Sequence, residues 1–129
     1  MYLIDTSVLI DFLKGKESKQ TIKLEKIILH KIPFGISAFT YQELLQGAKD
    51  QQEFDKLNRY LSTQKIYYPS ANSYKNAATI FFNCRKSGIT IRSTIDTLIA
   101  TTAIENGLIL LCSDKDFKFM KKVIDLEIE

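Results

Sequence analysis

The chain has 129 residues, of which 45% are hydrophobic and 26% are charged, and its net charge is +3. This balance is typical of one soluble domain with a single core, and no apolar run approaches the roughly 20 residues of a membrane span. The chain begins directly with a strand pattern and lacks the regions of a signal peptide, so we expect a cytoplasmic protein. Cys84 and Cys112 fit neither a metal-binding spacing nor a disulfide framework.

Strand and helix patterns alternate along the chain. In chain order they predict a strand (1–4), a helix (8–13), a helix (18–31), a strand (33–36), a helix (38–48), a helix (51–61), a strand (66–68), a helix (70–86), a helix (93–106), a strand (108–111), a short helix (116–120) and a last strand (123–126). Ser37 is the predicted N-cap of the third helix, and Gly88 marks the end of the fifth. Such alternation predicts a single α/β domain over residues 1–129, with helices on both faces of a parallel sheet.

Four acidic residues stand where such a fold could gather them. Asp5 directly follows the first strand, and Asp114 follows the fourth, so both fall on the carboxyl edge of a parallel sheet, where α/β folds build their sites. Asp96 lies in the first turn of a helix, and Glu43 lies on a helix face that could lean over this edge. Taken singly, each acid could be an ordinary surface carboxylate or a helix-end charge. Taken together, they predict one acidic pocket.

A pocket of this kind needs a counter-charge. Two carboxylates about 5 Å apart repel by roughly 3 kcal/mol at an effective dielectric constant of 20. Oxygen-only donors favour Mg²⁺, with Mn²⁺ as the other candidate, and the absence of cysteine or histidine from the set disfavours zinc. A hard divalent cation on carboxylates suits phosphodiester hydrolysis.

The segments that carry these acids resemble the motifs of PIN-domain nucleases, most closely the VapC-type toxins of toxin–antitoxin pairs. The four segments are 2–10, 37–47, 88–100 and 106–117. They cover nearly the whole chain in the family's order. The resemblance implies a three-layer α/β/α sandwich with a central, mostly parallel sheet of about five strands. It also implies a metal-dependent endoribonuclease that forms a homodimer, acts on RNA and is inhibited by a cognate antitoxin whose tail occupies the site.

The resemblance also assigns roles to residues. Asp5, Glu43, Asp96 and Asp114 would form the catalytic quartet, with Asp5 and Asp96 as the first choice of metal ligands. Asp116 would assist or replace Asp114. Hydroxyl support would come from Thr6 or Ser7, and the candidate RNA-binding residues beside the acids are Arg92 and Lys115. Further basic candidates for phosphate contacts are Lys14, Lys16, Arg85 and Lys86. Cys112 stands where many relatives carry threonine or serine, and a thiol is a weaker hydrogen-bond partner.

Two other readings compete with the nuclease. A catalytically silent PIN module would bind RNA or protein without cutting, and the retention of all four acids argues against it. A phosphoacceptor receiver or phosphatase would need an Asp-x-Asp pair in the opening strand, which this chain lacks. The aromatic residues are abundant, and we expect some of them to line a dimer or antitoxin interface. Those considered are Tyr41, Phe54, Tyr60, Tyr67, Tyr68, Tyr74, Phe81 and Phe82.

Overall fold

A parallel sheet of four strands, in the order β3-β2-β1-β4, forms the middle of the molecule. The computed structural model describes residues 1–129. The strands are β1 (Tyr2–Ile4), β2 (Phe34–Ser37), β3 (Lys65–Tyr67) and β4 (Ile109–Leu111). The helices are α1 (Thr6–Leu13), α2 (Lys19–Leu29), α3 (Ala38–Gln46), α4 (Gln51–Leu61), α5 (Ala71–Lys86), α6 (Thr94–Glu105) and α7 (Lys115–Met120).

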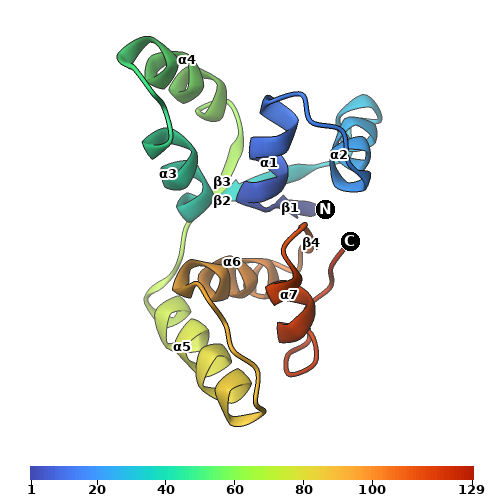
Figure 1. The fold of residues 1–129 in the computed structure, drawn as a ribbon, viewed down its shortest axis with the longest axis vertical. Helices are drawn as coiled ribbons and strands as arrows, with labels where there is room; N and C mark the ends of the chain where they lie inside the picture. Colours follow the sequence, from blue (N-terminus) through green and yellow to red (C-terminus); the bar gives the residue numbers. More distant parts are fainter.

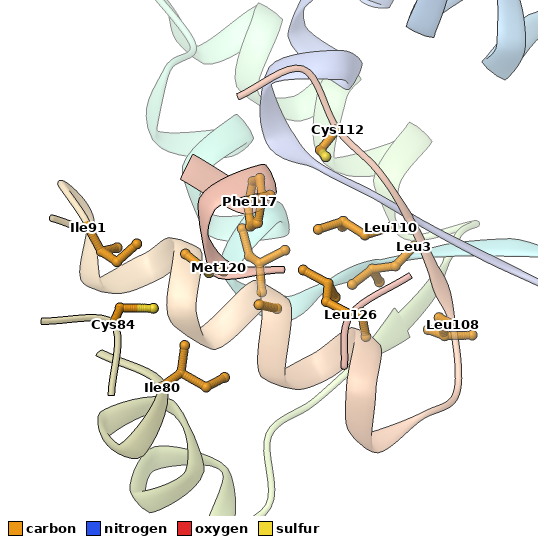
Figure 2. Close-up of a cluster of buried hydrophobic side chains, with 13 residues drawn as sticks. Leu3, Ile80, Cys84, Ile91, Leu108, Leu110, Cys112, Phe117, Met120 and Leu126 are labelled. Carbon is orange, nitrogen blue, oxygen red and sulfur yellow. The ribbon is translucent and has the colours of Figure 1, made fainter. Parts of the chain in front are cut away.

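The helices cover both faces of the sheet, so the predicted three-layer sandwich is confirmed (Figure 1). Successive side chains of a strand point to opposite faces. Leu3 accordingly packs among buried residues of α5, α6 and α7, whereas Tyr2 and Ile4 pack among buried residues of α1 to α4. Figure 2 shows the first of these two cores, in which Phe117 and Met120 of α7 lie close to Leu110 of β4. The two cores fix α6 and α7 on one side of β1, and α1 and α3 on the other.

Local signals set several element ends as predicted. The Ser37 hydroxyl accepts a hydrogen bond from the Thr40 backbone N–H (3.0 Å), which makes Ser37 the N-cap of α3. Gly88 has a φ of 78° just after α5, a conformation that favours glycine. Gly35 is required for another reason, because a Cβ there would lie 2.6 Å from Tyr67 Cε2 and 2.7 Å from the Lys65 carbonyl oxygen. Its missing side chain lets β2 and β3 pair closely.

The prediction of a fifth strand over residues 123–126 is wrong, because the sheet has four strands. Val123 and Ile124 lie in a turn after α7 and pack against the core, which explains their apolar character without a strand. The following residues do run beside β4, but only as one bridge between Leu110 and Ile128. One isolated bridge does not make a regular strand. No helix in the structure has the length and apolar character needed to cross a membrane.

Candidate active site

Asp5 lies at the carboxyl edge of the sheet, between β1 and α1. Its backbone N–H donates to the Leu111 carbonyl (3.0 Å), so the ends of the neighbouring strands β1 and β4 meet beside it. The carboxylate is 4% exposed and accepts a 2.6 Å hydrogen bond from the Ser7 hydroxyl. Burial raises the pKa of Asp5, hydrogen bonds from Ser7 and the backbone oppose this rise, and the charge of Glu43 adds to it. The hydrogen bonds thus offset part of the desolvation cost of ionising this nearly buried acid at the edge of the sheet.

Glu43 is held toward the same edge by hydroxyl groups. The Thr6 hydroxyl donates to Glu43 Oε1 (2.7 Å) and lies 3.0 Å from Thr40 Oγ1, which in turn lies 3.2 Å from Ser37 Oγ. Sequence reasoning assigned Ser37 only a capping role and gave Thr40 none. The signal was their spacing, because residues 37, 40 and 43 are three apart and share one face of α3.

Asp96, Asp114 and Asp116 form the tightest acidic group of the structure. One carboxylate oxygen of each lies within 4.8 Å of the others. Asp96 comes from the first turn of α6, and Asp114 is the N-cap of α7, where it accepts a 2.9 Å hydrogen bond from the Asp116 backbone N–H. Asp116 is 3% exposed. Sequence reasoning left the choice between Asp114 and Asp116 open, and the structure brings both to Asp96.

Arg92 supplies one internal counter-charge to this group. Its Nη2 lies 3.2 Å from Asp114 Oδ1, and its Nε lies 3.2 Å from Asp116 Oδ2. The Arg92 backbone N–H also donates to Asp116 Oδ2 (3.2 Å), which ties the segment before α6 to α7. Because the Arg92 side chain remains 64% exposed, its guanidinium is accessible to solvent as well as paired. The residue predicted to contact RNA is therefore engaged with two acids.

The electrostatics of Asp96 reveal how closely the acids gather. Burial, followed by the charges of Asp5, Asp114, Asp116 and Glu43, raises the pKa of Asp96 to about 7. Four acids from three other segments of the chain therefore act on the Asp96 carboxylate. At neutral pH this carboxylate is divided between its protonated and ionised forms.

Cys112 forms part of the wall beside the acids. Its side chain is 3% exposed and lies in the core shown in Figure 2. Burial, together with the charge of Asp5, raises the pKa of its thiol to about 12, and Lys118 acts in the opposite direction. The thiol therefore stays protonated at neutral pH and behaves as a small core side chain.

The other basic residues named from the sequence are less closely engaged with the acids. Lys115 is exposed at the start of α7, next to Asp114. Lys16 lies 3.9 Å from Asp11. Arg85 and Lys86 lie over the rings of Phe81 and Phe82 on α5. Lys14 lines a cleft between α1, α3 and α4 that also includes Glu43.

The donor set fits a hard divalent cation. Asp5, Glu43, Asp96, Asp114 and Asp116 supply only oxygen donors, and Arg92 is the one cationic side chain bonded to them. The remaining negative charge, the convergence of three carboxylates and the raised pKa of Asp96 all favour binding of a cation. Sequence reasoning placed Asp5 and Asp96 first as ligands, whereas the tightest oxygen group joins Asp96 to Asp114 and Asp116.

Comparisons with known proteins agree with this architecture. A family model described as the PIN domain matches residues 2–123. The curated protein Ribonuclease VapC11 of Mycobacterium tuberculosis is 26% identical over 129 residues, covering 98% of this chain and 96% of that protein. VapC ribonuclease Mb1587 of Mycobacterium bovis has the same identity and coverage.

Solved structures share the fold. The crystal structure of VapBC2 from Rickettsia felis, bound to a DNA fragment from their promoter, matches with a TM-score of 0.76 and 22% identity, covering 99% of this chain and 96% of that chain. A toxin–antitoxin complex from Klebsiella pneumoniae matches with a TM-score of 0.70 and 24% identity, covering 91% of this chain and 90% of that chain. At these identities, the two similarities speak for the fold alone.

Proposed function

This chain belongs to the PIN domain family, and from that membership we propose that it is a metal-dependent endoribonuclease, the toxin of a VapBC-type toxin–antitoxin pair, built as one PIN domain over residues 1–129. The observation that carries the proposal is the convergence of acids from three other segments on Asp96 at the carboxyl edge of the sheet. The curated relatives named ribonucleases support the choice of RNA as substrate.

In the proposed reaction, the acids hold a divalent cation, and Mg²⁺ is our first choice, with Mn²⁺ as the second. Asp5 and Asp96 are the proposed main ligands, while Glu43, Asp114 and Asp116 support the ligand shell. When bound, the cation supplies Lewis-acid chemistry that favours attack of water on a phosphodiester and stabilises the charge of the departing oxygen.

The protein's own residues orient this site. Ser7 holds the Asp5 carboxylate through a 2.6 Å hydrogen bond, and Thr6 holds Glu43 through a 2.7 Å hydrogen bond. Arg92 holds Asp114 and Asp116 on the side of Asp96, so that the proposed ligands are ordered before substrate arrives. Arg92 and Lys115 are exposed beside the acids, where we propose that they also meet phosphate groups of RNA.

The decisive experiment is cleavage of a fluorescently labelled single-stranded RNA mixture by the purified protein in Mg²⁺, in Mn²⁺ and in EDTA. We expect cleavage that EDTA abolishes and added Mg²⁺ restores. Asp5→Asn keeps the shape of the side chain and should remove cleavage, whereas Asp125→Asn, at an exposed position after α7, should not. Binding of RNA without cleavage in either ion would favour the silent binding module instead.

The partners follow from the same proposal. A cleft of about 580 Å³ between α1, α3 and α4 is lined by Glu43, Ile10 and Leu57, among others. An antitoxin segment in this cleft would reach the acidic edge, and this arrangement suits inhibition. A second cleft of about 580 Å³ on α5 and α6 carries the exposed rings of Tyr74 and Phe82, which we assign to the homodimer interface.

Light scattering of the protein, alone and co-expressed with the product of the neighbouring gene, tests these partners. We expect a dimer alone and a larger complex with the neighbour, in which RNA cleavage is suppressed. A monomer that binds nothing encoded beside it would contradict the toxin assignment. Since the proposed substrate is cellular RNA, we propose the cytoplasm as the site of action.

A further inference from the structure

A basic cleft lies beside the carboxyl end of β4. It has a volume of about 810 Å³ and lies between α2, the end of β4, α7 and the last residues of the chain. In Figure 1 the C-terminus lies in the space between α2 and α7. The residues of this cleft that matter here are Lys19, Lys23, Lys26, Cys112, Lys118 and Glu129. We call it the lysine cleft.

The lysine cleft gathers positive charge on two walls. Lys19, Lys23 and Lys26 are four and three residues apart, so they share one face of α2. Lys118 approaches from α7. The one carboxylate side chain among the lining residues is Glu129, 3.4 Å from Lys23.

Most of this positive charge has no partner within the protein. Lys19, Lys26 and Lys118 are exposed and take part in none of the ion pairs of the structure. Like charges on one surface repel each other, so an anionic ligand with several charges would be favoured there. Lys19, Lys26 and Lys118 together provide the positive charge that would bind a polyanion.

The floor of the lysine cleft joins the acidic site. Cys112 lines the cleft and directly follows β4, and Asp114 is only two residues further along the chain. Two residues span at most about 7 Å. The charges of Lys118 and Asp5 both affect the pKa of the Cys112 thiol. A single polyanionic chain that crosses the acids can therefore continue directly over the lysines.

Resting on the proposed ribonuclease function, we propose that the lysine cleft binds the phosphates of single-stranded RNA that flank the bond to be cleaved. The volume of the cleft lies within the roughly 300–1,000 Å³ range of small-ligand pockets, which suits one strand of a few nucleotides rather than a duplex. The backbone phosphates carry the charge, so this contact contributes affinity and direction of the strand but little sequence preference.

The test is binding of a 12-nucleotide, fluorescein-labelled single-stranded RNA, measured by anisotropy in EDTA at several salt concentrations. The background is Asp5→Asn, so that the RNA stays intact. The test variant combines Lys19→Gln, Lys26→Gln and Lys118→Gln. We expect at least about tenfold weaker binding, and a slope of log K against log salt that falls by about 2, at roughly 0.7 per lost phosphate contact.

A matched variant removes the same charge elsewhere. It combines Lys31→Gln, Lys49→Gln and Lys65→Gln, which are exposed and absent from the lysine cleft. Lys65 lies on β3, at the opposite edge of the sheet from β4. We expect its RNA affinity to fall by less than about threefold and its salt slope to change little. Lys23→Gln is measured separately, since it also loses the contact with Glu129.

Cleavage kinetics separate this inference from the proposed function. With Asp5 restored, the cleft variant should cleave RNA with a raised KM and an unchanged kcat, because the lysines bind the strand away from the reacting phosphate. If the wild type cleaves RNA while the cleft variant binds and cleaves it as the wild type does, the lysine cleft inference is overturned and the nuclease stands. The lysine cleft inference is also overturned if the cleft variant binds RNA as the wild type does and loses only a complex with an acidic partner protein. A wild type that neither binds nor cleaves RNA overturns both.

Discussion

Replacing Asp96 with asparagine should stabilise the metal-free protein at alkaline pH. Burial, and then the neighbouring acids, raise the pKa of Asp96 from 3.8 to about 7. The folded protein therefore holds this proton more tightly than the unfolded chain, and its stability falls as the pH rises through this window. At 1.36 kcal/mol per pKa unit, the rise corresponds to about 4 kcal/mol lost above pH 7. Asparagine has the shape of the acid and no charge, so Asp96→Asn avoids that loss.

The assay is urea unfolding of both proteins in EDTA at pH 4, 6 and 8. At pH 8 we expect the free energy of unfolding of Asp96→Asn to exceed that of the wild type by about 2–4 kcal/mol. At pH 4 the wild-type carboxyl is largely protonated, so the two proteins should nearly coincide. Asp125→Asn, which changes an exposed acid, should differ from the wild type by less than about 0.5 kcal/mol at each pH.

A divalent cation should make the wild type more stable than Asp96→Asn, which reverses the order expected in EDTA. If Mg²⁺ binds as proposed, it should raise the stability of the folded wild type by RT ln(1 + [Mg²⁺]/Kd), whereas Asp96→Asn has lost a proposed ligand and should gain less. The reasoning is refuted if Asp96→Asn is no more stable than the wild type at pH 8 in EDTA. A difference of equal size at pH 4 and pH 8 would refute it too, because the effect would then not come from the ionised carboxylate.

Three further substitutions probe the frame around the acids. Arg92→Gln removes the internal counter-charge, so affinity for Mn²⁺, measured by calorimetry, should rise on the order of tenfold. Thr6→Val removes the hydrogen bond to Glu43 and should cost about 1–2 kcal/mol of stability, read by urea unfolding, and slow RNA cleavage about tenfold. Gly35→Ala places a methyl group against β3 and should lower stability by about 2–3 kcal/mol, whereas Gly47→Ala, with its nearest neighbouring atom 3.5 Å away, should be nearly neutral.

Controls for the first two use exposed residues of the same type. Arg59→Gln on α4 should leave Mn²⁺ affinity unchanged, and Thr90→Val, before α6, should leave cleavage unchanged. Weaker Mn²⁺ binding by Arg92→Gln would mean that Arg92 matters more for holding its two carboxylates in place than for opposing the cation. Wild-type cleavage by Thr6→Val would show that Glu43 needs no hydroxyl support.

The sequence by itself determined the layered architecture, because periodicity is a local property. Apolar runs such as residues 108–111 have the length of strands, and Ser37 and Gly88 carry the chemistry of helix ends. These signals predicted the parallel sheet and its two helical layers. They failed at residues 123–126, where an apolar run packs against the core as a turn. Apolar side chains need only burial, which a turn can provide as well as a strand. Their sequence therefore does not reveal whether a neighbouring strand is there to pair with them.

Tertiary structure alone decided the detail of the site. Sequence order indicated that Asp5, Glu43, Asp96 and Asp114 could share one edge. It could not show that Arg92 spans Asp114 and Asp116, or that Thr6 reaches Glu43 across 37 positions of the chain. Nor could it show that lysines of α2 and α7 face one cleft. Such contacts depend on how helices pack on the sheet to within an ångström or two, and that placement is fixed by the whole core rather than by any local segment.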